Sequence, residues 1–162
     1  MLKKMSAFAF FLGIVFPLSA AAQTSLVRFE GGIGSQPFAR NAAGAVVAND
    51  VLGVNPGGRP WVISRLSVDV KTDGRISVDG RGLLLAGGNN VGRNGNQTVH
   101  ARLFCGGAAH NSGTVPLDAE GDFRIEDSLS PTPPLSCADP ILLIVSGVAP
   151  AGNWFAAGIQ KQ

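Results

Sequence analysis

The sequence predicts an all-β protein: an antiparallel two-sheet β-sandwich, immunoglobulin-like or a related Greek key, that follows a cleaved N-terminal signal helix. Its apolar runs are short, rich in Val, Ile and Leu, and separated by turn residues, a pattern typical of strands. Within 65–71, Leu66, Val68 and Val70 alternate with polar residues, which predicts one buried and one wet face. No window after residue 22 has the pattern of a helix.

Residues 1–22 have the three-part order of a secretory signal peptide. Lys3 and Lys4 supply the positive end, residues 7–18 form an apolar stretch, and small residues surround the expected cut after Ala22. The stretch is shorter than the roughly 20 residues that a membrane span needs. A lipid anchor is not expected, because the first cysteine is Cys105. The mature chain is therefore expected to be exported to the periplasm or the medium.

Residues 23–162 are long enough for one domain with its own core. The full chain contains 13 Lys and Arg and 11 Asp and Glu, but the two lysines of the signal leave with it. The mature domain is then formally neutral, so its charge gives no reason to expect nucleic acid as a partner.

Turn residues divide the mature chain into short strands. Asp73-Gly74 and Asp79-Gly80 are dipeptides that favour tight hairpins, and residues 118–122 predict a turn between 115–117 and 123–125. The strands are expected near 25–30, 45–52, 60–71, 74–79, 82–87, 97–105, 114–118, 122–127, 140–146 and 152–159.

Cys105 and Cys137 are the two cysteines of the chain. An oxidising destination and the lack of a third thiol predict that they form an intramolecular disulfide. Their spacing is unlike the Cys-x-x-Cys arrangement of redox and metal pairs.

The longest polar loop, residues 87–97, is rich in Gly and Asn. Amide side chains offer paired donors and acceptors to sugar hydroxyls or to a peptide backbone, and aromatic rings offer stacking surfaces. A flexible connector and core packing of the tryptophans are the competing interpretations. The candidate ligand-binding residues are Asn89, Asn90, Arg93, Asn94, Trp61 and Trp154.

The motifs of several kinds of catalytic or metal site are missing. A blue-copper site built on Cys105 and His110 would lack its axial Met, because Met1 and Met5 lie in the signal. There is no Gly-x-Ser-x-Gly elbow and no His-Glu-x-x-His motif. Residues 118–122 lack the EF-hand spacing, and a hairpin turn accounts for them. We therefore expect no catalytic residues, metal or cofactor, although spatial pairing of other carboxylates would leave an enzyme open.

Three segments carry a resemblance: Phe29-Glu30-Gly31-Gly32-Ile33-Gly34, the run from Gly80 to Gly88, and the run from Gly152 to Gly158. Together they resemble a group of uncharacterised exported bacterial proteins over nearly the whole mature chain. The resemblance implies an exported single domain and carries no activity, ligand or site residue.

The expected function is that of a secreted or periplasmic, non-enzymatic module that binds a ligand or contributes to a surface assembly. Its partner would be a protein or a glycan, with no stable membrane insertion of the mature chain. A glycan-binding module predicts an exposed Trp61 or Trp154 beside the 87–97 loop. A protein-interaction module predicts an uncovered sheet edge at 25–34. An enzyme predicts a pocket where two carboxylates, or a histidine and a carboxylate, converge.

Overall fold

The computed structural model describes residues 23–162, which form thirteen strands and no helix. The predicted signal peptide and its cut lie outside the described residues. In the described part of the chain no helix is long and apolar enough to cross a membrane. Nine strands form the main sheet: β1 (Ser25–Gly34), β5 (Arg65–Lys71), β6 (Arg75–Arg81), β8 (Thr98–Cys105), β9 (Ala108–Asn111), β10 (Val115–Pro116), β11 (Phe123–Ser128), β12 (Ile141–Ser146) and β13 (Trp154–Gln160). Two separate pairs are formed by β2 (Phe38–Arg40) with β3 (Val46–Ala48) and by β4 (Trp61–Val62) with β7 (Leu84–Leu85).

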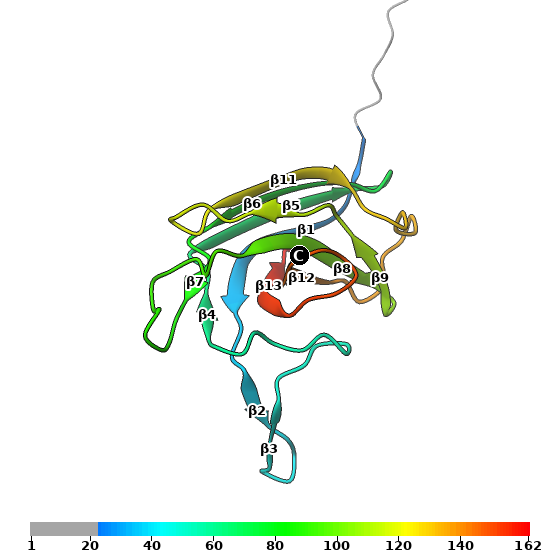
Figure 1. The fold of residues 1–162 in the computed structure, drawn as a ribbon. Coiled ribbons are helices and arrows are strands. Elements are labelled where there is room, and N and C mark those ends of the chain that lie inside the picture. The colour runs from blue at the N-terminus through cyan, green and yellow to red at the C-terminus, as the bar shows by residue number, and fades with distance from the viewer. Residues whose placement is uncertain (1–22) are drawn as a thin grey trace, which may run out of the picture.

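The main sheet is antiparallel, in the order β10-β8-β12-β13-β1-β5-β6-β11, and β9 also pairs with β8. It curls into a half-barrel, so that β1, β5, β6 and β11 form one layer and β8, β12 and β13 face them (Figure 1). The prediction of an all-β, antiparallel protein is confirmed. Two separate sheets are not confirmed, because one hydrogen-bonded sheet supplies both layers.

Strand β1 joins the two layers. Its first half pairs with β5 and its second half with β13, and its register with β13 shifts between Phe29 and Gly32. Such a bulge bends a strand, and Gly31 takes the positive φ of 88° within it. A Cβ on Gly34 would lie 1.9 Å from the carbonyl oxygen of Trp61, so this glycine permits the close approach of β4. The expectation that 25–34 is an uncovered edge is therefore wrong, because β1 lies between two partner strands.

Some predicted turns are confirmed and one is wrong. Gly74 takes a positive φ between β5 and β6, and Asp118 N–H donates to the Asp122 carbonyl in the predicted turn at 118–122. That turn does not close a hairpin, since β10 pairs with β8 and β11 with β6. Asp79-Gly80 lies inside β6, where a Cβ on Gly80 would lie 2.1 Å from the Phe123 ring. The glycine makes room for an aromatic ring and forms no turn.

The predicted strand boundaries need further correction. The expected strand 60–71 is divided into β4 and β5, and the one at 45–52 shortens to β3. Strands β2 and β9 were not predicted. The hairpin of β2 and β3 projects from the half-barrel (Figure 1), and Phe38 on it is 67% exposed.

The main core lies between the two layers and is formed by buried Val, Leu, Ile and Phe side chains. The predicted disulfide between Cys105 and Cys137 is confirmed, with 4.7 Å between the two Cα atoms. It joins the end of β8 to the loop before β12, and Gly106 N–H donates to the Ala138 carbonyl beside it. This covalent link is consistent with an oxidising location.

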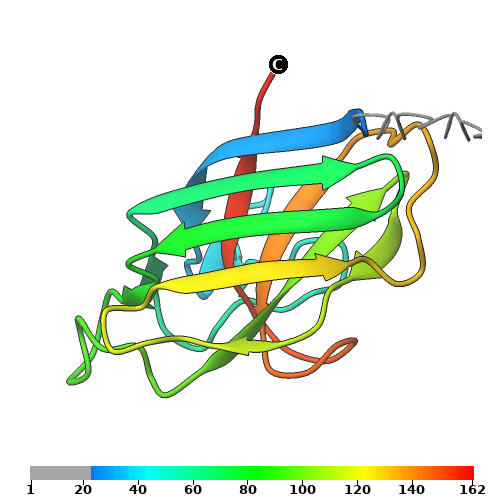
Figure 2. The same ribbon diagram turned by 90° about the horizontal axis from the view of Figure 1, so that it is seen from above.

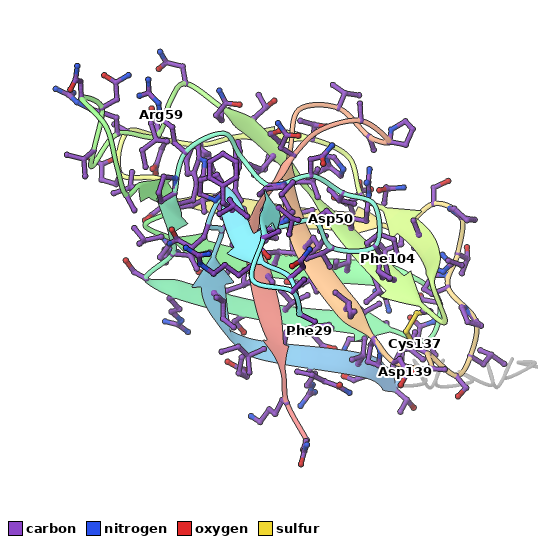
Figure 3. All side chains as sticks on the ribbon, turned by 90° about the horizontal axis from the view of Figure 1, so that it is seen from below. Phe29, Asp50, Arg59, Phe104, Cys137 and Asp139 are labelled. Carbon is purple, nitrogen blue, oxygen red and sulfur yellow. A yellow bond between two sulfur atoms is a disulfide. The ribbon has the colours of Figure 1, made fainter. Side chains whose placement is uncertain are left out.

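A second, smaller core lies on the outer face of β8, β12 and β13. Residues 49–58, here called the strap, cross this face, and Figure 3 labels Asp50 of the strap and Phe104 of β8. Val54 of the strap packs with Phe104 and Trp154. Trp154 N–H donates to the Asn55 carbonyl and its ring Nε1–H to the Asn49 carbonyl at 2.9 Å. By contrast, the outer faces of β1, β5, β6 and β11 lie side by side without a covering segment (Figure 2).

Candidate ligand-binding site

The candidate site is a hollow of about 440 Å³ at one end of the half-barrel. Three segments meet there: the end of the strap, the 87–97 loop, and the turn between β12 and β13. Figure 3 shows Arg59 of this region at the opposite end of the molecule from Cys137 and Asp139. The hollow is lined by Gly57, Gly58, Arg59, Trp61, Leu85, Asn90, Gly95, Gln97, Ser146, Asn153 and Phe155.

An aromatic stack forms the apolar part of the lining. The rings of Trp61 and Phe155 lie with their centroids 4.0 Å apart and their planes 17° apart. Strand β4 positions Trp61 by pairing it with Leu85, while Trp61 N–H donates to the Ser35 carbonyl. A Cβ on Gly57 would lie 2.8 Å from the Trp61 Nε1 atom and 3.0 Å from the Phe155 ring. Gly57 therefore lets the strap cover the stack.

The two rings present little surface to the hollow. Trp61 is 4% exposed and Phe155 is 5% exposed. Trp154 is equally buried, beneath the strap. The exposed tryptophan that a stacking site needs is not present, and core packing of both tryptophans is the correct interpretation. Contacts to a ligand would come mainly from the polar groups around the stack.

Those polar groups come from three separate segments. Arg59 follows the strap, Asn90 and Gln97 belong to the 87–97 loop, and Asn153 precedes β13. Asn153 N–H donates to the Ser146 hydroxyl at 2.9 Å, which holds the turn beside the hollow. The rim thus combines one guanidinium, which only donates hydrogen bonds, with three amides, which both donate and accept them.

The 87–97 loop is held in place by hydrogen bonds. Leu85 N–H donates to the Arg93 carbonyl, and Gly92 N–H donates to the Leu85 carbonyl. The Asn94 side chain donates to the Asp118 carbonyl at 2.7 Å and accepts from Asn96 N–H. The loop is therefore anchored to its neighbours and positions the amides of its rim.

The structure brings some of the predicted ligand residues together. Trp61 and Asn90 line the hollow. Arg93, Asn94 and Asn90 line a smaller recess of about 310 Å³ that shares Asn90 and Gly95 with it. Asn89 lines neither space.

Gln97 and Gly95 also line the hollow and belong to the predicted 87–97 loop. The lining residues that sequence reasoning did not assign to a site are Gly57, Gly58, Arg59, Leu85, Ser146, Asn153 and Phe155. Arg59 had a local signal, because it stands after two glycines and two residues before Trp61. No local pattern marks the turn between β12 and β13, since its place depends on the pairing of those strands.

A second hollow, of about 460 Å³, lies on the uncovered layer and is lined by residues of β5, β6 and β11, among them Asp69, Lys71, Arg75 and Glu126. Two of its carboxylates have partners within the fold: Asp69 lies 2.8 Å from the Lys71 ammonium, and Glu126 accepts from the Ser77 hydroxyl at 2.7 Å. The pKa of Asp69 is lowered, because hydrogen bonds from Lys71 and Ser25 outweigh the opposing effect of burial. A general acid needs a raised pKa, so Asp69 does not suit that role.

The two histidines lie apart from carboxylates. His100 Nδ1 lies 2.8 Å from the Gly147 carbonyl oxygen, and His110 Nδ1 lies 2.7 Å from that of Pro131. Within residues 23–162, no three His, Cys, Asp or Glu side chains are grouped as metal ligands. The pocket with a histidine beside two acidic side chains, which would favour an enzyme, is not found among the described residues.

No protein-family model matches the sequence, and no curated protein or solved structure is significantly similar to it.

Proposed function

We propose that this chain is an exported, non-enzymatic binding module that holds a saccharide in the end hollow. The observation that carries the proposal is the convergence of Arg59, Asn90, Gln97 and Asn153 around one hollow from three separate segments. Saccharides present closely spaced hydroxyl groups, and amides pair with them as both donor and acceptor. We describe the fold as sandwich-like because two facing layers enclose the main core.

Binding loops carried by a rigid scaffold support this function. The hollow lies at the end of the half-barrel, and its segments are held by backbone hydrogen bonds: Ala86 N–H donates to the Pro60 carbonyl, and Gly57 N–H to the Trp154 carbonyl. Because the groups are positioned before a ligand arrives, little conformational entropy would be lost on binding. The disulfide supports an exported location for the module.

The test is calorimetric titration of the purified, oxidised protein with a panel of neutral and acidic trisaccharides. We expect at least one to bind, and the double variant Asn90→Ala/Asn153→Ala to weaken binding about tenfold, as the loss of two hydrogen bonds would. Asn89→Ala is the matched control, because Asn89 is a neighbouring exposed amide outside the hollow. Equal affinities for the double variant and the wild type would place binding elsewhere. No binding by any trisaccharide would overturn the proposal.

A protein partner is the second candidate, and the hairpin of β2 and β3 favours it. Phe38 and Val46 on this hairpin are both at least 60% exposed. Two-stranded hairpins are marginally stable in water without further strands or a covering element. Exposed apolar side chains such as these are typical of sites that bind the surface of another protein. Binding there would leave the end hollow free, so the Asn90→Ala/Asn153→Ala variant would keep full affinity for such a partner.

A further inference from the structure

Most cations on the uncovered outer face of β1, β5, β6 and β11 are paired within the fold, and Arg65 at the start of β5 is the exception among them. Each of five basic side chains has a carboxylate oxygen within 4.0 Å: Arg28, Lys71, Arg75, Arg81 and Arg124. Arg81 contacts both Asp79 and Asp122, and its hydrogen bonds lower the pKa of each carboxyl. These five side chains are therefore already paired and are not free to bind an anionic ligand.

The end hollow differs from that face in its charge. Arg59 lines the hollow and Arg93 the adjoining recess, and neither has a carboxylate within 4.0 Å among residues 23–162. The linings of both spaces contain no acidic residue. The Asp118 carbonyl accepts from Asn94 nearby, but its carboxylate accepts from Glu120 N–H and Asp122 N–H within its own turn. The positive charge at the hollow is thus left uncompensated by these side chains.

The fold also restricts the Arg59 side chain. A Cβ on Gly88 would lie 3.3 Å from Arg59 Nη1 and 3.5 Å from its Cζ, so the guanidinium rests against the start of the 87–97 loop. Gly88 takes a φ of 75°, a conformation that favours glycine and leaves this space free. A guanidinium presents a planar fork of donors that matches the two oxygens of a carboxylate.

We propose that the ligand of the hollow is an acidic saccharide, with a uronate carboxylate bound by Arg59 and its hydroxyl groups bound by the rim amides. Asn90 lies between the two arginines, because it lines both the hollow and the recess. Arg93 would then attract the same chain of sugars from the recess. This inference rests on the proposed saccharide-binding function and adds the charge of the ligand to it.

The experiment compares galacturonate, glucuronate and mannuronate trisaccharides with their methyl esters, which keep the hydroxyl groups and lose the charge. Calorimetry of the oxidised protein should show at least one acid binding tenfold or more tightly than its ester, since hydrogen bonds to charged groups are the stronger ones. Arg59→Gln should remove that preference, and high salt should reduce it. Arg65→Gln is the matched control: an exposed arginine that also has no carboxylate within 4.0 Å among the described residues and lies outside both spaces.

The outcomes separate this inference from the function on which it rests. If esters and acids bind equally, the acidic ligand is wrong and saccharide binding stands. If neither class binds, and the neutral sugars of the first test also fail, the proposed function is wrong. If an acid binds tightly and Arg59→Gln binds it as well as Arg65→Gln does, the assignment of Arg59 is overturned. Unchanged circular dichroism and melting temperature would show that both variants are folded.

Discussion

The outer faces of the two layers differ in what covers them. The outer face of β1, β5, β6 and β11, here called the bare face, has no covering segment (Figure 2). Its Arg, Lys, Asp and Glu side chains form ion pairs, for example Arg28 of β1 with Asp69 of β5 and Arg124 with Glu126 along β11. The face of β8, β12 and β13 is covered by the strap and by the turn between β12 and β13. One sheet therefore has a solvated outer surface in one layer and a second core in the other.

This difference explains where the candidate site lies. The strap crosses the covered face and then turns into β4, which brings Gly57 and Arg59 to the end of the half-barrel beside the 87–97 loop. On the bare face, Arg28, Lys71, Arg75, Arg81 and Arg124 form ion pairs with carboxylates of the same chain. The strap thus contributes Gly57 and Gly58 to the hollow, whereas no lining residue comes from the strands of the bare face.

The largest expected loss of stability comes from Trp154→Ala, a substitution on the covered face. Trp154 is buried against Val54 and Val145, and its ring Nε1–H donates to the Asn49 carbonyl. Truncating a buried Trp costs about 3–5 kcal/mol of the free energy of unfolding, because it leaves a cavity. Urea denaturation of the oxidised protein measures this loss.

Trp154→Phe is the control for this substitution. It keeps an aromatic ring under the strap and removes the Nε1–H donor, so we expect it to lose less than half as much. A loss below about 1 kcal/mol for Trp154→Ala, typical of an exposed site, would contradict the second core.

Local sequence patterns predicted the bare layer well. Alternation in 65–71 and the Asp73-Gly74 turn identify β5, its buried face and its hairpin to β6. The strands of the covered layer were also predicted, at 97–105, 140–146 and 152–159, but the burial of their outer face was not. Seven of the eight residues of β8, from Val99 onward, are buried and show no alternation. The strap that buries the outer side chains lies some 50 residues away in the chain, beyond any local pattern.

The same limit applies to the candidate site. Asn90 and Trp61 were predicted from a polar loop and an aromatic residue, both local features. Asn153 and Phe155 reach the hollow through the pairing of β12 with β13, which no dipeptide reveals. Asp79-Gly80 shows the reverse error, because the dipeptide resembles a turn while Phe123, more than 40 residues later, determines its role.

A smaller effect is expected from His100, which is fully buried on the covered face. Burial lowers its pKa, and the nearby charge of Arg102 acts in the same direction, although the Gly147 carbonyl opposes both. The neutral imidazole therefore contributes stability that is complete above the unfolded pKa of about 6.5. That stability is lost as the pH falls below 6.5 towards the lower folded pKa, because the unfolded chain takes up the proton first.

Urea denaturation between pH 7.5 and pH 5 measures this loss. The slope that one proton can produce is at most about 1.4 kcal/mol per pH unit. His100→Gln should show a smaller slope than the wild type, since glutamine does not titrate. Parallel slopes for the two proteins would show that His100 is not the group that takes up the proton.

The smallest expected effect is on the bare face, from Asp69→Asn. Asp69 lies 2.8 Å from Lys71 and 3.5 Å from Arg28, and its side chain is partly exposed. Ion pairs in contact with solvent contribute about 0–1 kcal/mol, because water and salt screen them. Urea denaturation should therefore detect a loss of less than about 1 kcal/mol, and 1 M NaCl should reduce it further. A salt-independent loss as large as that of Trp154→Ala would mean that the charges of the bare face stabilise the half-barrel as strongly as the second core does, and the contrast between the two faces would be wrong.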